Sequence, residues 1–322
     1  MTVPDRINKS ELPERFLKSS IAFLGRSSFE ERCTAAYTEI AACKFAYTHF
    51  FISKGESRKA KTIRDRINLS KDEISQIDIS NPLQAQQTIV EQLRKISELP
   101  IDTSIVIDIT TFRREELLIL IKEMRRLPDE LLNGASFVYS IASKMGRWLS
   151  NNVRQTRPVI GYPGEMMSRR GTHLVILAGV EHHRALAAID AYEPSNISLG
   201  IVPRDESVSV DLFQRNLELR DFIVRHFDNV TAEFDFSAKD PQAVVRSLEA
   251  VVGRRPDQNT IIAPLNTKLS TLGCAAYALK NPNVQLCYSE VEVYNAGKYS
   301  EPGEETLLVP YRSIFESVVI VA

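Results

Sequence analysis

The feature that most constrains the fold is the passage from a strand pattern to a helix pattern in residues 103–124. The short apolar run Ser104–Asp108 is followed by a polar turn and then by an amphipathic run from Glu115. A buried strand that feeds a helix is typical of parallel α/β sheets, whose ligands bind at the carboxyl ends of strands and at helix N-termini. A similar passage recurs at residues 259–280. The sequence therefore predicts an α/β fold with the same strand–turn–helix unit in each half.

The two halves of the chain repeat one order of predicted elements. A chain of 322 residues suits two domains of ordinary size. Identical letters mark the fifth predicted strand of each half, Tyr139-Ser140 and Tyr288-Ser289. We therefore expect an internal duplication that yields two tandem Rossmann-like domains with mainly parallel sheets. The expected boundaries are an N-terminal arm at 1–20, a first domain at 21–165 and a second at 173–322.

Composition excludes several classes of protein. Apolar residues make up 43% of the chain and charged residues 25%, which is typical of a globular protein. The net charge of −1 gives no reason to expect a nucleic-acid partner. The basic segment 54–71 is interpreted as a solvated helix or loop, with a basic lip near a phosphate-bearing ligand as the alternative. The four cysteines show no CxxC spacing, and no signal peptide or apolar run of membrane-spanning length is seen. A cytoplasmic protein with no membrane association is therefore expected.

Polar and charged side chains gather at two predicted turns in each half. One turn follows the first strand and the other follows the fourth, so both lie at carboxyl ends. In a doubly wound sheet these strands adjoin at the switch point, and their turns border one crevice. Hydroxyls, amides, helix-start N–H groups and nearby cations together suit a phosphate or nucleotide. The candidate ligand-binding residues are Arg26, Ser27, Ser28, Asp108, Thr110, Thr111, Arg113, Glu181, His182, Asn266, Thr267 and Lys268.

Other interpretations of these residues remain open. Taken singly, serine, threonine and asparagine at such positions commonly only cap helices. The run Glu181-His182-His183 predicts no metal site, because adjacent histidines on a helix point in different directions and no HExxH follows. No cofactor is expected either. Walker A, GxGxxG, GxSxG and kinase signatures are absent, which argues against an NTPase or a conventional dehydrogenase but leaves open an enzyme with scattered catalytic residues.

Two segments resemble the fourth-strand motif of CARF domains. They are residues 107–118, IDITTFRREELL, and residues 263–273, APLNTKLSTLG. The turns LGRSSFEER and LAGVEHHR occupy the other ligand-facing position of that family. Two such domains in one chain resemble the SAVED arrangement.

The resemblance implies a sensor of a nucleotide-like anion, a cyclic oligonucleotide, bound between the two halves in prokaryotic antiviral defence. It places Thr111, Arg113, Thr267 and Lys268 on the pocket lining. Such a sensor is expected to act through a protein partner or by self-assembly. Two alternatives stay open: a metal-independent phosphodiesterase, similar to a ring nuclease, that cleaves the ligand, and a scaffold subunit of a defence complex with vestigial clefts.

Overall fold

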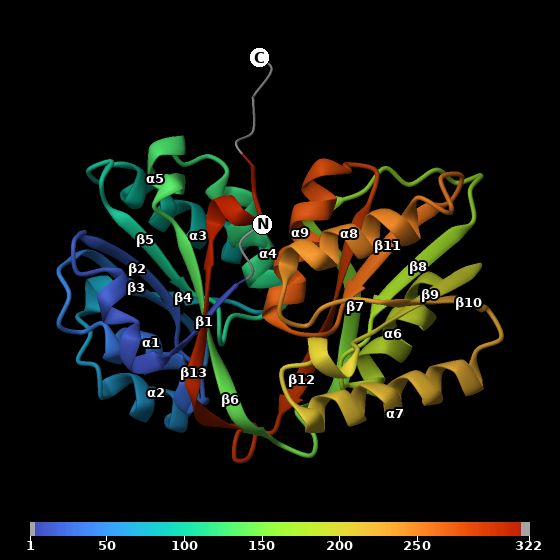
Figure 1. The fold of residues 1–322 in the computed structure, drawn as a ribbon, viewed down its shortest axis with the longest axis horizontal. Coiled ribbons are helices and arrows are strands. Elements are labelled where there is room, and N and C mark those ends of the chain that lie inside the picture. The colour runs from blue at the N-terminus through green and yellow to red at the C-terminus, as the bar shows by residue number, and fades with distance from the viewer. Residues whose placement is uncertain (1–3, 317–322) are drawn as a thin grey trace. The chain divides into compact units, whose positions relative to one another are not determined.

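The computed structural model describes residues 4–316, which form two compact units (Figure 1). The first unit comprises residues up to 147 together with those from 296 onward, and the second comprises residues 148–295. Each unit is a layered α/β structure built on one mostly parallel sheet. The predicted fold class, two Rossmann-like α/β units, is therefore confirmed.

The first unit contains a sheet of seven strands among the described residues, in the order β1-β13-β6-β5-β2-β3-β4. The strands from β6 to β4 in that order run parallel, whereas β13 pairs antiparallel with β6 and β1 antiparallel with β13. The strands are β1 Asp5–Asn8, β2 Ile21–Arg26, β3 Phe45–Ser53, β4 Ile74–Ile77, β5 Ser104–Asp108, β6 Ser136–Met145 and β13 Ser300–Pro310.

Helices cover both faces of this sheet. Helix α4 is buried almost throughout, because its sequence is apolar on nearly every side after the first turn. The basic segment 54–71 contains a solvated helix that buries only Ala60 and Ile63, as its pattern predicts. The helices are α1 Ala35–Glu39, α2 Arg58–Asp65, α3 Pro82–Ser97, α4 Arg114–Met124 and α5 Asp129–Asn133.

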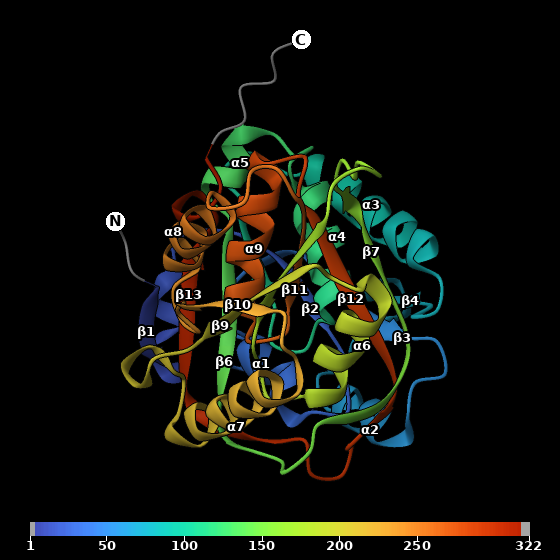
Figure 2. The same ribbon diagram turned by 90° about the vertical axis from the view of Figure 1, so that its right-hand side faces the viewer.

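The second unit contains a sheet of six strands within the described part of the chain, in the order β10-β9-β8-β11-β12-β7. Helices α6 and α7 lie on one face, and α8 and α9 lie on the other (Figures 1 and 2). The elements are β7 Ser150–Pro163, β8 Thr172–Leu177, α6 His182–Tyr192, β9 Asn196–Ile201, α7 Val210–His226, β10 Val230–Asp235, α8 Pro241–Val252, β11 Asn259–Pro264, α9 Lys268–Lys280 and β12 Gln285–Tyr294.

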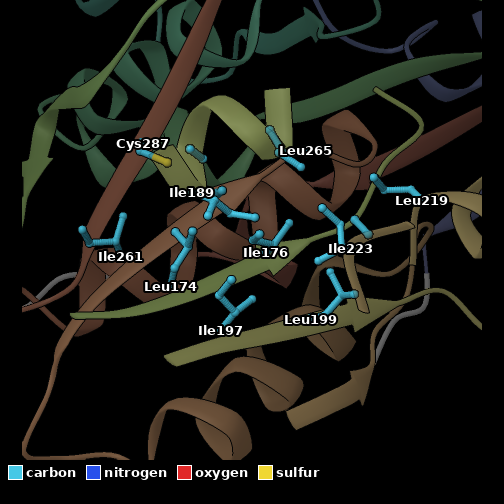
Figure 3. Packing of buried hydrophobic residues seen from close by; sticks show 14 residues of the cluster. Leu174, Ile176, Ile189, Ile197, Leu199, Leu219, Ile223, Ile261, Leu265 and Cys287 are labelled. Carbon is cyan, nitrogen blue, oxygen red and sulfur yellow. The ribbon is translucent and has the colours of Figure 1, made fainter. Parts of the chain in front are cut away.

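The core of the second unit illustrates why these strands are central. Leu174 and Ile176 of β8 are fully buried, and they pack with residues of the neighbouring strands and of α6 and α7 (Figure 3). Strands covered by helices on both faces must be apolar on both sides, which explains their unbroken hydrophobic runs. The packing partners labelled in Figure 3 are Ile189, Ile197, Leu199, Leu219, Ile223, Ile261, Leu265 and Cys287.

Both units share one strand order, and both complete it with a strand that the sequence pattern assigned elsewhere. Strand β7 follows β6 along the chain but pairs with β12, and β13 follows β12 but pairs with β6. Residues 150–163 therefore belong to the second unit, and residues 300–310 to the first, which differs from the expected boundaries at 165 and 173. The expected arm is also part of a sheet, through β1. Local patterns predict strands, but they do not say which of two open edges a strand will cover.

Candidate ligand-binding site

The two predicted turns meet in both units. In the first unit, the Thr111 hydroxyl donates a hydrogen bond to the carbonyl oxygen of Arg26, which ends β2. In the second, the Asn266 side-chain amide donates to the carbonyl oxygen of Ala178, directly after β8. Gly179 allows this approach, since a Cβ there would lie 2.0 Å from the carbonyl oxygen of Leu265. The turns after the first and fourth predicted strands thus lie side by side in each unit, as expected, while the crevice between them stays a prediction.

Arg26 is enclosed rather than presented to a ligand. Its side chain is 3% exposed, and its Nε and Nη2 atoms donate to the two carboxylate oxygens of Glu116 at 2.9 and 3.1 Å. Its remaining hydrogen bonds go to the carbonyl oxygen of Ser27 and the hydroxyl of Ser53. Burial by itself would raise the pKa of Glu116, but the charge and hydrogen bonds of Arg26 outweigh it and lower that pKa. The structure therefore gives Arg26 an internal role that its position in the sequence did not predict.

The other hydroxyl candidates of the first unit fasten the turns to the rest of the unit. Ser27 donates to Glu56 at 3.0 Å, and the Ser28 hydroxyl accepts from the backbone N–H of Glu30. The Thr110 hydroxyl accepts from the backbone N–H of Ser140 at 2.9 Å. For these three residues the simpler interpretation, that they satisfy turns and backbone groups, describes the contacts seen.

Helix α9 follows the turn after β11 in the second unit, and its N-terminus is capped as the sequence predicts. Thr267 is the N-cap of α9: its hydroxyl accepts from the N–H of Ser270 at 3.1 Å and donates to the carbonyl oxygen of Ala238 at 2.7 Å. Lys268 is the first residue of the helix and is partly exposed. The capped turn thus holds a lysine at a helix N-terminus.

A basic residue also opens the corresponding helix of the first unit. Arg113 is the N-cap of α4, Arg114 is its first residue, and both are partly exposed. By helix position, Arg114 corresponds to Lys268, although the candidate set contains Arg113 in its place, because the turn before α4 is longer than the turn before α9. Cations at a helix N-terminus oppose the helix dipole, whereas anions there are stabilised. The basic residues at the matching helix N-termini of the two units are therefore the feature that most favours an anionic ligand.

Asp108, at the carboxyl end of β5, is a buried acid with one satisfied oxygen. Its Oδ1 accepts from the N–H of Thr110 at 3.0 Å, while its Oδ2 has no hydrogen-bond partner among the described residues. Burial raises the pKa of Asp108 to about 6, against the opposing influence of Thr110 and Arg32. The corresponding strand of the second unit, β11, ends at Pro264, so the second unit has no acid at this position.

A buried network that the sequence analysis missed surrounds Arg32 in the first unit. Its Nη2 donates to Glu30 at 2.6 Å, its Nη1 to the carbonyl oxygen of Ser140 at 2.8 Å, and its Nε to the Ser300 hydroxyl at 3.1 Å. The Ser300 hydroxyl also donates to Glu30 at 2.7 Å. Because Ser300 is the first residue of β13, the network attaches that strand to the turn after β2.

The second unit repeats this network with the same residue types. Arg184 pairs with Glu181 at 3.0 Å, donates to the carbonyl oxygen of Ser289 at 2.8 Å, and contacts the Ser150 hydroxyl at 3.4 Å. Ser150 is the first residue of β7, as Ser300 is of β13. The sequence signals for the pair of networks were the repeated Tyr-Ser and a glutamate shortly before an arginine. This match supports the inferred duplication.

Glu181 and His182, two candidate ligand-binding residues of the second unit, make internal contacts. Glu181 is 6% exposed and is held by Arg184 and by the Ser150 hydroxyl. The His182 ring packs against Phe222 with their centroids 5.2 Å apart, and burial lowers the pKa of His182. Both residues contribute to packing and charge balance at the turn.

Within residues 4–316, the site contains neither a metal-binding cluster nor a serine triad at Ser150. No group of three His, Cys, Asp or Glu side chains suited to a metal occurs within residues 4–316. The Ser150 hydroxyl lies 3.3 Å from Nε2 of His183, but that same nitrogen is the one 4.0 Å from Glu181. In a triad the acid binds the opposite ring nitrogen and leaves the first for the serine. The arrangement therefore fits the strand-anchoring network rather than a nucleophile.

Comparisons with known proteins add no family assignment. No protein-family model matches the sequence, and a search of curated proteins finds no match. Among the described residues, none of the helices is both long enough and apolar enough to cross a membrane.

Proposed function

We propose that the protein is a nucleotide-sensing regulatory protein. Its CARF-like units would bind a nucleotide-like anion of the cyclic-oligonucleotide class at the carboxyl edges of their sheets, in prokaryotic antiviral defence. The observation that carries this proposal is the matched pair of basic helix starts, at Arg113 and Arg114 on α4 and at Lys268 on α9. In each unit that start adjoins the turn after the first strand.

The N-terminus of a helix attracts an anion through its charge distribution. Free N–H groups and the helix dipole favour an anion there, and a flexible cation in the same turn adds a direct charge contact. A cation at a helix N-terminus opposes the helix dipole, at a cost of roughly 0.3–1 kcal/mol, and a bound anion offsets this cost. Arg26 is saturated by Glu116, whereas Arg113 and Lys268 are partly exposed. We therefore assign the charge contacts to the helix starts rather than to Arg26.

Cleavage of the ligand is the alternative, and the geometry supports it less. A phosphodiesterase needs a base or nucleophile within reach of the substrate. Asp108 has a pKa near neutrality but is only 2% exposed, and Ser150 is only 3% exposed. Sensing therefore ranks ahead of catalysis.

A thermal-shift screen tests the proposal. Cyclic di-, tri- and tetranucleotides are compared with their linear forms on the full chain and on Arg113→Ala and Lys268→Ala. A ligand at a hundredfold excess over its Kd stabilises the folded state by about 2.7 kcal/mol. We expect one cyclic species to raise the Tm, and the helix-start variants to lose that rise. Lys280→Ala, at the opposite end of α9, is the matched control and is expected to keep it.

The outcomes separate the three functions. Turnover of the ligand is measured by chromatography. A Tm shift without turnover supports the sensor, and turnover of the same nucleotide supports the phosphodiesterase. Absence of any shift across the nucleotide panel overturns both and leaves the scaffold subunit, to be tested by pull-down of a partner protein.

A further inference from the structure

The first unit surrounds one buried guanidinium with two buried carboxyl groups. Arg32 is 3% exposed and pairs with Glu30, which is 8% exposed. Asp108 Oδ2 is buried without a hydrogen-bond partner among the described residues, on β5 beside β6, whose Ser140 carbonyl oxygen accepts from Arg32. The charges of Arg32 and Glu30 also act on Asp108. Ser300 completes the group and is the point at which β13 joins it. The cluster therefore links a titratable acid at the end of β5 to the start of an edge strand.

The second unit holds the same network without the second acid. Arg184, Glu181 and Ser150 repeat the contacts of Arg32, Glu30 and Ser300, but β11 ends at Pro264. The two networks thus differ in their ionisable neighbours: Asp108 belongs to the first alone, and His183 contacts Ser150 in the second. With His183 replaced by glutamine, the second network serves as an internal control for the effect of Asp108.

We propose that the Arg32–Glu30–Ser300 network is a proton-responsive latch on β13, with Asp108 as its sensor. When Asp108 carries a proton, Arg32 balances Glu30 alone and its donors stay on Glu30, Ser300 and the carbonyl oxygen of Ser140. When Asp108 loses the proton, the buried group holds two carboxylates and one guanidinium. The second carboxylate repels Glu30 and competes for Arg32, so the hold on Ser300 weakens.

The other charged and titratable neighbours of Asp108 do not reverse the expected direction, in which a higher pH weakens the contact with Ser300. Glu30, Glu31 and Arg32 lie before and within the turn at residues 31–34, and Cys33 is in the same turn. Burial raises the pKa of Cys33 to about 12, so the thiol is neutral over the relevant range. Tyr139 on β6 acts on Arg32, whose pKa is raised, so the guanidinium stays charged. Asp108 is therefore the group that changes charge near pH 6.

Hydrogen exchange of the full chain tests the latch directly. Exchange in β13 and β7 is measured by mass spectrometry at pH 5.0 and pH 7.5, and each rate is corrected for the intrinsic pH dependence. We expect protection of β13 to fall by about tenfold from the lower to the higher pH, because the ionised Asp108 competes with Glu30 for Arg32 and weakens the contact with Ser300. Protection of β7, which is anchored by Ser150, is measured in His183→Gln, where the imidazole beside Ser150 no longer titrates, and is expected to change much less.

Three variants test the cause of this pH response. Asp108→Asn, which keeps the shape of the side chain, is expected to abolish the pH response of β13 and to keep it protected at both pH values. Ser300→Ala should expose β13 at both pH values, whereas the matched Ser150→Ala should affect β7 alone. An equal pH response of β13 and β7, or a response that survives in Asp108→Asn, overturns the proposal.

Discussion

Arg26 and Glu116 form a buried two-point ion pair that joins the end of β2 to the first turn of α4. The guanidinium and carboxylate meet at 2.9 and 3.1 Å, and the two side chains are 3% and 5% exposed. Glu116 also accepts from the backbone N–H of Arg113, so the pair closes the helix start as well. The orientation of this candidate binding edge therefore depends on an interaction between residues 90 positions apart.

Breaking this pair should be costly. Glu116→Gln leaves the Arg26 charge buried without its counter-ion, and we expect the free energy of unfolding to fall by about 3–5 kcal/mol. Urea denaturation of the full chain measures the change. Glu233→Gln breaks the surface pair with Arg220, which is roughly one-third exposed on both sides, and should cost at most about 1 kcal/mol. A loss below 1 kcal/mol for Glu116→Gln would contradict the assignment of Arg26 as an internal ion pair.

Asp108→Asn should stabilise the protein at neutral pH. The folded pKa, about 6, lies above the usual value of 3.8, so the folded state binds the proton more strongly than the unfolded state. The contribution of Asp108 to the free energy of unfolding is fully present below about pH 4 and is lost as the pH rises through 6. We expect the variant to gain about 1–3 kcal/mol at pH 7.5 and little at pH 4. Denaturation curves at both pH values check this, and a variant less stable at pH 7.5 would refute it.

Two buried histidines should make the protein sensitive to acid. Burial lowers the pKa of His49 and of His173 to about 4, against an ordinary 6.5. The unfolded state therefore takes up these protons first, and stability falls as the pH drops from 6.5 towards 4. His49→Phe and His173→Gln should each reduce this acid slope, which a series of denaturation curves from pH 7 to pH 4 measures. His226→Gln, on an exposed side chain, serves as the control. An unchanged slope in both core variants would show that other groups govern the acid response.

Fragments should fold according to the sheet pairings rather than the repeat boundaries. Residues 148–295 contain every strand of the second sheet, from β7 to β12. Expressed alone, this fragment should unfold cooperatively. Residues 173–322, the domain expected from the sequence, lack β7 and would leave the edge of β12 open, which favours aggregation. Circular dichroism melts and size-exclusion chromatography compare the two. Cooperative folding of residues 173–322 to the same stability would contradict the pairing.

The sequence by itself determined the local structure and much of the topology. Unbroken apolar runs such as Ser104–Asp108, each followed by a helical pattern, were sufficient to predict parallel strands and the two Rossmann-like units. The adjacency of the turns at Thr111 and Asn266 to those after the first strands also followed, because a doubly wound sheet has one switch point. These features depend on residues a few positions apart, whose periodicity is visible in one dimension.

Only the tertiary structure decided which strand completes each sheet and which charged residues are enclosed. The pattern of residues 150–163, with its two prolines, did not predict the strand β7, and the places of β7 and β13 depend on pairing between distant segments. Arg26 was predicted to face a ligand, but Glu116 on a distant helix satisfies it. In the sequence, Arg32 and Arg184 are ordinary residues near a helix start. Only the folded structure shows that they contact Ser300 and Ser150. A charged side chain takes its role from its burial and its partner, and both are set by contacts that sequence spacing does not encode.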